Sequence, residues 1–290
     1  MTVIPAIHVN STAPFAANNK GAAYYQEDFE LLCTVLSALM WRNKNGPIKL
    51  YTDKTGYDYY ASFGLLDLWD GGIDTSVVGS IPDTVNQHIF WAAAKIFALR
   101  NEATPVAVID TDMIVWENLE PELNGRQFVV FHREELHEFI YIPGFYLKTR
   151  KDYQFDPEWD WTALPCNMAF SYFSDPGFKK YYTDCALDFM TGNLEYPMEM
   201  ISQMVFAEQR LAAICAVKMN IPIHHFLHDP YQKDNNCFTH LWGGKGHARN
   251  DLRHRKALCA AMLRKINEHF PDYHNRLMDA ELFRNSGIGA

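Results

Sequence analysis

The chain has 290 residues, enough for one large domain or a domain with a small extension, and its 48% hydrophobic and 21% charged residues are typical of a globular protein. The formal net charge of −9 argues against a nucleic-acid-binding protein, which needs a basic surface. It leaves a nucleotide sugar open as a ligand, because a metal ion supplies positive charge locally.

Alternating strand and helix patterns fill the first half of the chain. Strands are predicted at 3–9, 48–51, 76–81 (an edge strand) and 106–110, and helices at 29–40 and 88–99. This alternation predicts an α/β fold with a mostly parallel sheet and helices on both faces. The second half is less regular, with strands at 127–131, 167–173 and 221–226, a loop-rich stretch at 141–161, and helices from Pro176, over 200–219 and from 250.

The cysteines and the N-terminus bear on location. No two of the 6 cysteines form a C-x-x-C motif, and several fall in apolar helical stripes, as in reduced core cysteines of a cytoplasmic protein. The N-terminus lacks a basic region followed by an apolar run, and the longest apolar stretch, 31–41, is short. We therefore expect a cytoplasmic protein without a signal peptide or transmembrane segment.

The most informative segment is Val108-Ile109-Asp110-Thr111-Asp112, where two carboxylates one residue apart follow an apolar strand. They are expected at the carboxyl edge of the sheet, where open α/β sheets bind ligands. Side chains at i and i+2 point to one side, so both carboxylates could bind one cation that holds a diphosphate. By itself, an Asp-x-Asp is more often a solvated turn.

Three further segments carry polar groups that need an explanation. Glu208 stands within an apolar helical stripe beside Gln209, which indicates either a structural ion pair or a polar site. Lys95 shares a helix face with His88 and Trp91, and it either reaches the same cleft or extends to water. In 240–246 a His, glycines and a Lys could ligate a cation and hold phosphate, or form an ordinary turn.

Together these motifs resemble the GT-A glycosyltransferases, and most nearly the glycogenin and lipopolysaccharide-galactosyltransferase-like group. The matching segments are 91–96 with 108–115, Asn167 to Phe170, Glu208-Gln209 and His240 to Lys245. The chain departs from that pattern in three places. The motif from His240 to Lys245 is one residue short before the lysine, and the Pro-Trp that usually follows the lysine is absent. In the first-strand loop, residues 8–11 stand in place of the usual pattern of Asp and Tyr. Arg210 stands where many relatives have an acidic residue.

The resemblance implies a Rossmann-like GT-A catalytic domain over 1–246 and a C-terminal helical extension over 247–290. It implies a hexosyltransferase that uses Mn²⁺ or Mg²⁺ and takes its sugar from a nucleoside-diphosphate sugar, with a UDP-sugar as the expected donor. The implied acceptor is a carbohydrate or glycoconjugate, and the implied reaction retains the anomeric configuration. The roles that it implies are metal binding by Asp110, Asp112 and His240, donor binding by Lys95, Gly243, Lys245, His8, Asn10, Thr52 and Asp53, and catalysis by Asn167, Glu208 and Gln209.

Two alternatives remain open at this point. A haloacid-dehalogenase-like phosphatase also uses Asp-x-Asp after an apolar strand, although its motif normally follows the first strand. A non-catalytic nucleotide-sugar-binding protein could share the same fold, because a fold does not establish turnover.

Overall fold

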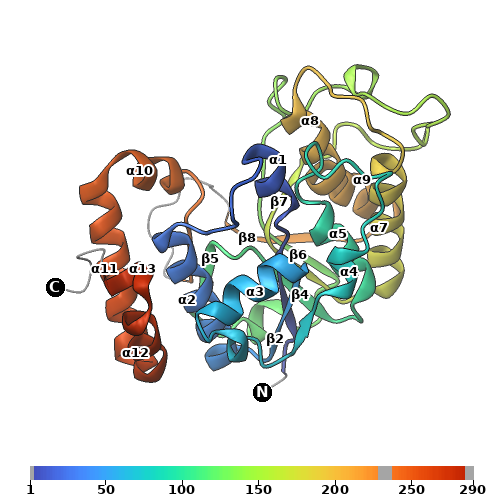
Figure 1. The fold of residues 1–290 in the computed structure, drawn as a ribbon. Helices are drawn as coiled ribbons and strands as arrows, with labels where there is room; N and C mark the ends of the chain where they lie inside the picture. Colours follow the sequence, from blue (N-terminus) through green and yellow to red (C-terminus); the bar gives the residue numbers. More distant parts are fainter. Residues whose placement is uncertain (1–2, 228–236, 285–290) are drawn as a thin grey trace.

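The computed structural model in Figure 1 describes residues 3–227 and 237–284. Its main sheet has seven strands in the order β3-β2-β1-β4-β7-β6-β8, and β7 is antiparallel to both neighbours while the other pairs are parallel. The strands are β1 (Ala6–Asn10), β2 (Ile48–Thr52), β3 (Ile73–Asp74), β4 (Val106–Ile109), β6 (Phe128–Arg133), β7 (Cys166–Phe173) and β8 (Ile223–Leu227). The predicted α/β fold, with a mostly parallel sheet flanked by helices, is therefore confirmed.

A second, two-stranded sheet lies at the carboxyl edge of β4. It pairs β5 (Met113–Val115) with β9 (Phe238–His240) in antiparallel fashion, with Met113 opposite His240. This ribbon joins the Asp-x-Asp turn to a segment more than a hundred residues later in the chain.

Helices cover both faces of the main sheet (Figure 1). One face carries α2 (Asp28–Lys44), and the other carries α5 (Ala93–Asn101), α7 (Pro176–Met190) and α9 (Leu211–Lys218). The remaining helices are α1 (Ala13–Asn18), α3 (Lys54–Ser62), α4 (Ser76–Gly79), α6 (Glu120–Leu123), α8 (Met200–Val205), α10 (Gly244–Asn250), α11 (Leu252–His269), α12 (Pro271–Asp279) and α13 (Glu281–Arg284), with 3-10 turns at Leu66–Leu68 and Gly144–Tyr146.

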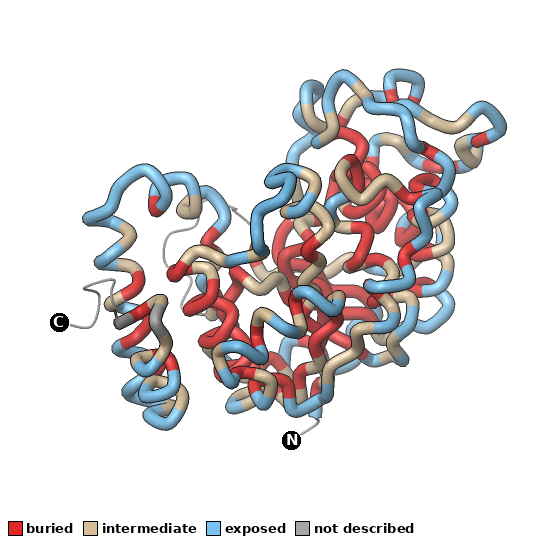
Figure 2. The backbone as a smooth tube through the Cα atoms, in the orientation of Figure 1, coloured by how far each residue is buried: buried red, intermediate tan, exposed pale blue. Residues whose placement is uncertain are grey.

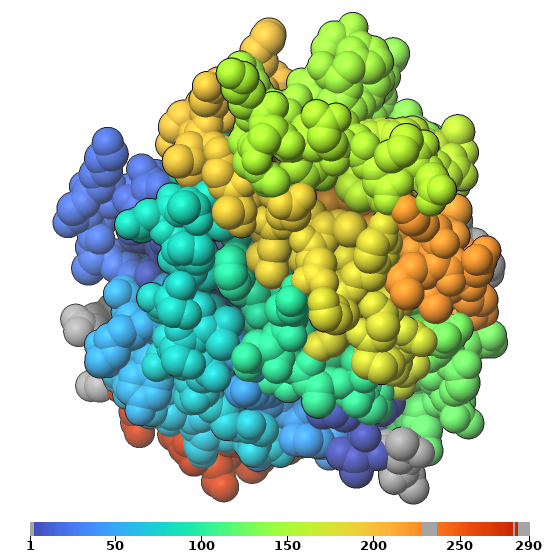
Figure 3. Space-filling view, turned by 90° about the vertical axis from the view of Figure 1, so that its right-hand side faces the viewer, coloured from blue at the N-terminus to red at the C-terminus, as the bar shows by residue number. Residues whose placement is uncertain are grey.

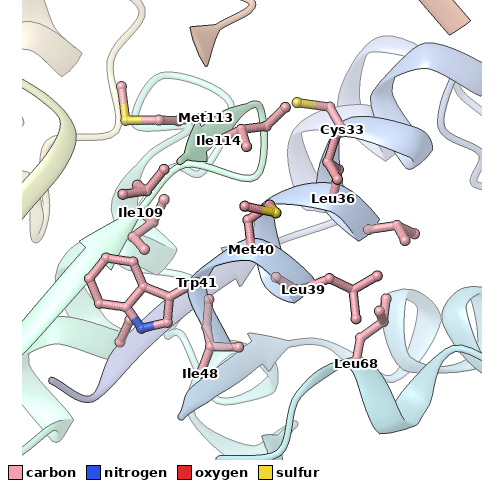
Figure 4. Close-up of a cluster of buried hydrophobic side chains, with 14 of the residues drawn as sticks. Cys33, Leu36, Leu39, Met40, Trp41, Ile48, Leu68, Ile109, Met113 and Ile114 are labelled. Carbon is pink, nitrogen blue, oxygen red and sulfur yellow. The ribbon is translucent and has the colours of Figure 1, made fainter. Parts of the chain in front are cut away.

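The core has two parts because the central strands are buried on both faces. In β4, Ala107 and Ile109 belong to the cluster with α2, whereas Val106 and Val108 belong to the cluster with α5 and α7. Figure 2 shows the buried backbone concentrated in the sheet region, and Figure 4 shows Met40 and Trp41 of α2 in the first cluster. Strand β4 therefore holds its carboxyl end, where the Asp-x-Asp begins, on a rigid support.

The C-terminal helices pack onto the same core rather than onto a core of their own. Helix α11 lies against α2, and its Cys259, Met262 and Ile266 are buried in the cluster that contains α2. Arg255 extends this contact by pairing with Asp28 at 2.8 Å.

Two predictions about local structure are wrong. The edge strand expected at 76–81 is helix α4, because the Asp74 side chain accepts hydrogen bonds from the N–H groups of Ser76 and Val77 at 2.8 and 3.1 Å and so starts a helical turn. The helix expected from residue 88 begins at Ala93, because the Asn86 side chain accepts a hydrogen bond from the His88 N–H at 3.0 Å and holds the preceding residues in turns.

The helix expected over 200–219 is present, but it contains a π-helical turn. Helices α8 and α9 are joined by the turn Phe206–Arg210, which includes Glu208 and Gln209. The whole segment Met200–Lys218 is long and apolar enough to cross a membrane, yet most of it is buried inside the molecule. A core helix of a globular protein can have the same length and composition.

Candidate functional site

A cavity of about 430 Å³ opens at the carboxyl edge of the sheet. It is lined from β1, α5, the Asp-x-Asp turn, β7, the π-helical turn and the β9–α10 connection. Its polar lining residues are Ser11, Lys95, Asp110, Thr111, Asp112, Asn167, Glu208, Gln209, His240 and Lys245. Eight of the thirteen residues predicted to form the site thus reach one cavity, from segments far apart in the sequence.

The backbone brings Asp110, Asp112 and His240 together. The Asp110 N–H donates to the Ala169 carbonyl at 2.8 Å, which prolongs the contact between β4 and β7 by one residue. The Leu241 N–H donates to the Asp112 carbonyl at 3.0 Å, beside the Met113–His240 strand pair. One ligand atom from each of the three side chains lies within 4.8 Å of the others.

Each carboxylate of the Asp-x-Asp pair has a lysine partner. Lys95 Nζ lies 2.6 Å from Asp110 Oδ1 and 2.5 Å from Glu208 Oε1, and it also donates to the Met168 carbonyl at 3.3 Å. Lys245 Nζ lies 2.8 Å from Asp112 Oδ2. The three carboxylates of the cavity are therefore partly compensated by two ammonium groups, each of which is also suited to bind phosphate.

Burial and charge give the three candidate ligands different protonation tendencies. Burial raises the pKa of Asp110 against the attraction of Lys95, and the charges of Asp112 and Glu208 raise it further. Burial also acts to raise the pKa of Asp112, but Lys245 and His240 outweigh it and hold that pKa below its usual value. Burial lowers the pKa of His240 to about 4, so its imidazole is neutral near pH 7 and has a lone pair for a cation.

This set of donor groups fits a divalent cation. Two carboxylates and a neutral imidazole within one small cluster suit Mn²⁺, and carboxylates with added phosphate or water oxygens suit Mg²⁺. Asp112 and His240 are held close to one another, since His240 Nε2 lies 3.7 Å from Asp112 Oδ2.

The π-helical turn directs three consecutive side chains to three places. Glu208 pairs with Lys95, Gln209 accepts a hydrogen bond from the Tyr141 hydroxyl at 2.6 Å, and the Arg210 guanidinium donates to the Tyr141 and Trp161 carbonyls at 3.1 and 2.5 Å. The Tyr182 hydroxyl donates to the Glu208 carbonyl at 2.8 Å and so satisfies a backbone group in the turn. Such turns are frequent at functional sites, since the extra residue changes the direction of its neighbours.

Asn167 completes the far wall of the cavity from β7. Its Nδ2 donates to Glu134 Oε1 at 3.0 Å, and its Oδ1 accepts from the Ala169 N–H at 3.1 Å. Two tryptophans on the rim keep much of their surface exposed, Trp91 at 41% and Trp242 at 70%. Exposed indole faces beside a polar cavity are suited to stack on sugars or bases.

The profile of one protein family matches residues 1–280, nearly the whole chain, and its description is "Family of unknown function (DUF6734)". The chain belongs to the DUF6734 family. No curated protein matches this DUF6734 chain by sequence.

Several solved structures resemble this DUF6734 member at low identity. Mouse xyloside xylosyltransferase 1 in its apo form has 11% identity and a TM-score of 0.37, and the alignment covers 78% of this chain and 85% of that one. The galactosyltransferase LgtC, solved with donor and acceptor sugar analogues, has 8% identity and a TM-score of 0.39, with 89% and 96% covered. The apo glycosyltransferase GlyE of Streptococcus pneumoniae has 14% identity and a TM-score of 0.36, with 82% and 58% covered.

Five residues of the predicted donor site do not line the cavity: His8, Asn10, Thr52, Asp53 and Gly243. Strand β1 alternates, so that Val9 and Ser11 face the cavity while the fully buried His8 faces α2, bonded to Ser37 Oγ at 3.0 Å and to Trp69 Nε1 at 3.3 Å. Asp53 instead caps α3 by accepting the Gly56 N–H at 2.9 Å, and Thr52 is fully buried. Ser11 and Tyr141 were not among the residues predicted to form the site, because the alternation in β1 does not by itself show which face points to the cavity.

Proposed function

We propose that this protein is a metal-dependent glycosyltransferase of the hexosyltransferase type. It would transfer a sugar from a nucleoside-diphosphate sugar to a carbohydrate or glycoconjugate acceptor. The donor that we expect is a UDP-sugar. The observation that supports this most is the cluster of Asp110, Asp112 and His240 in one cavity with Lys95 and Lys245. Carboxylates for a cation and ammonium groups for phosphate are together the groups that a metal-bound diphosphate requires.

Asp110, Asp112 and His240 would hold Mn²⁺ or Mg²⁺. When bound, the ion would neutralise charge on the departing diphosphate. Lys245 would turn from Asp112 toward a phosphate oxygen, and Lys95 would add a second positive charge on the donor side. Glu208 keeps Lys95 in place through their 2.5 Å contact. Trp91 and Trp242 would offer surfaces for the base or the sugar.

We further propose that the anomeric configuration is retained. An inverting transferase needs a carboxylate that is free to deprotonate the acceptor. The carboxylates that line the cavity in the described part of the chain are Asp110, Asp112 and Glu208, and Glu208 is already paired with Lys95. A proton NMR time course of the anomeric signals, run with an active donor, tests this, and initial formation of the inverted product would contradict it.

A donor-hydrolysis screen tests the function itself. The protein is incubated with UDP- and GDP-sugars in Mn²⁺ or in EDTA, and nucleoside diphosphate is measured. We expect release with at least one donor in Mn²⁺, none in EDTA, and none from Asp112→Asn. Phosphate release from simple phosphomonoesters would favour a phosphatase, and donor binding without release, with every acceptor class supplied, would favour a binding protein.

A further inference from the structure

A second cavity, of about 540 Å³, also borders the π-helical turn, through Arg210, whereas Glu208 and Gln209 line the first cavity. Its lining includes Leu136, Tyr141, Phe145, Phe155, Trp161 and Arg210, so most of its wall is aromatic or aliphatic. The loop segment 134–165 supplies most of these residues and stands, in yellow-green, at the top of Figure 3. The Trp161 ring packs directly against Gly144, and a larger residue there would clash with it, because a Cβ at that position would lie 2.5 Å from Cη2 of the indole.

One side-chain contact connects the two cavities. Tyr141 lines the second cavity, and its hydroxyl donates at 2.6 Å to Gln209, which lines the first. The next residue, Arg210, lines the second cavity and fixes its walls by donating to the Tyr141 and Trp161 carbonyls at 3.1 and 2.5 Å. The Tyr141–Gln209 pair therefore forms part of the partition between the second cavity and the donor cavity.

The walls of the second cavity favour an apolar ligand over a free sugar. Each hydroxyl of a buried sugar needs a hydrogen-bond partner, and this lining offers few. Phe145 is 79% exposed in the structure, so an apolar ring placed against it would remove water from both surfaces. The acidic side chain in the lining, Glu138, is exposed, and so it stays solvated at the rim.

Arg210 adds one polar requirement to this apolar site. Its side chain is 3% exposed, and its Nε is buried without a hydrogen-bond partner among the described residues. It also has no carboxylate within ion-pair distance in the described part of the chain, and its charge is partly compensated by the Trp161 ring at 5.5 Å. A ligand oxygen that reached this group would satisfy a buried donor that is costly to leave unpaired.

We propose that the second cavity binds the apolar aglycone of the acceptor, an aryl or alkyl glycoside, with the acceptor sugar directed past Tyr141 toward Gln209. The glycosidic oxygen or a neighbouring ligand oxygen would accept from Arg210. This inference rests on the proposed glycosyltransferase function. It assigns the acceptor class from the lining of a cavity that the donor does not use.

The test compares phenyl and methyl β-glycosides of glucose and galactose, with binding followed by saturation-transfer NMR in the absence of donor and metal. Phenyl glycosides should bind at least about tenfold more tightly than methyl glycosides, the effect of burying one ring. Phe145→Ala should weaken phenyl glycosides about three- to tenfold and leave methyl glycosides unchanged. The matched control is Phe139→Ala, because Phe139 is 83% exposed and lies outside the lining.

Equal binding of phenyl and methyl glycosides, or equal effects of Phe145→Ala and Phe139→Ala, would overturn the assignment. A parallel titration with UDP and GDP in Mn²⁺ separates it from the proposed function. Nucleotide binding without a preference for phenyl glycosides would overturn the aglycone site alone. Phenyl-glycoside binding without binding of either nucleotide would overturn the glycosyltransferase proposal and, with it, the acceptor role of the cavity.

Discussion

Replacing Lys95 by Met tests the charge balance of the donor cavity. The change removes the ammonium group that lies 2.6 Å from Asp110 and 2.5 Å from Glu208, whose side chains are 30% and 9% exposed. Removing one partner from a buried ion pair costs about 3–5 kcal/mol, because the other charge is left without compensation. We expect a loss of about 3 kcal/mol in the free energy of unfolding, at the lower end because Asp110 is partly solvated.

The measurement is urea unfolding in EDTA for the wild type, Lys95→Met, Glu208→Gln and the double variant. Lys95→Met should cost at least about 1 kcal/mol less in the Glu208→Gln background, since one of its two partners is already neutral. Lys54→Met is the control, because Lys54 forms an exposed pair with Asp58, at 76% and 57% exposure, and should cost under about 0.5 kcal/mol. A loss below about 1 kcal/mol for Lys95→Met, or the same loss in both backgrounds, would refute this reasoning.

Three further changes probe separate parts of the account. Lys245→Ala should weaken UDP binding in Mn²⁺ by about 1–3 kcal/mol through loss of a charged hydrogen bond, and an unchanged calorimetric affinity would contradict its phosphate role. Tyr141→Phe removes the 2.6 Å bond to Gln209 and should lower turnover while changing stability by only about 0.5–1.5 kcal/mol; full turnover would show that the bond does not position Gln209. Burial lowers the pKa of His8 from 6.5 to about 3, so between these values acid protonates the imidazole in the unfolded chain but not in the folded one. The stability that neutral His8 gives the fold is complete above pH 6.5, and the free energy of unfolding should fall by about 2 kcal/mol on acidification to about pH 5. His8→Gln should flatten the pH dependence of urea unfolding by that amount, and parallel curves would contradict this.

The polar residues of the donor cavity could be predicted where a charge interrupts an apolar pattern. Asp110 follows a strand buried on both faces, and Glu208 stands within an apolar helical stripe, so each needed a partner or a ligand. The sequence left open whether Glu208 is structural or functional. The structure places it both in an ion pair with Lys95 and in the lining of the cavity.

Other features depended on contacts that local patterns do not contain. A period of two in β1 separates His8 from Val9, but the choice of face is made by Ser37 and Trp69, which lie elsewhere in the chain. The Val77 and Val78 pair favoured a strand, but the Asp74 side chain begins a helix there. The second cavity is built largely by a loop whose sequence has no periodic pattern, so the sequence did not predict it. The π-helical turn was not predicted either, because its apolar residues fit the stripe of a regular helix equally well.

Isothermal titration of UDP and GDP, with Mn²⁺ and then with EDTA, tests the central claim most directly. Asp112 Oδ2 is 2.8 Å from Lys245 Nζ and belongs to the candidate ligand cluster, so Asp112→Asn removes a ligand charge with little change in volume. Asp58→Asn is the matched control, on an exposed helix surface. We predict that at least one of the two nucleotides binds the wild type and Asp58→Asn in Mn²⁺, and that this binding is lost in EDTA and in Asp112→Asn. Equal nucleotide affinity with and without chelator, or in Asp112→Asn, would contradict the account.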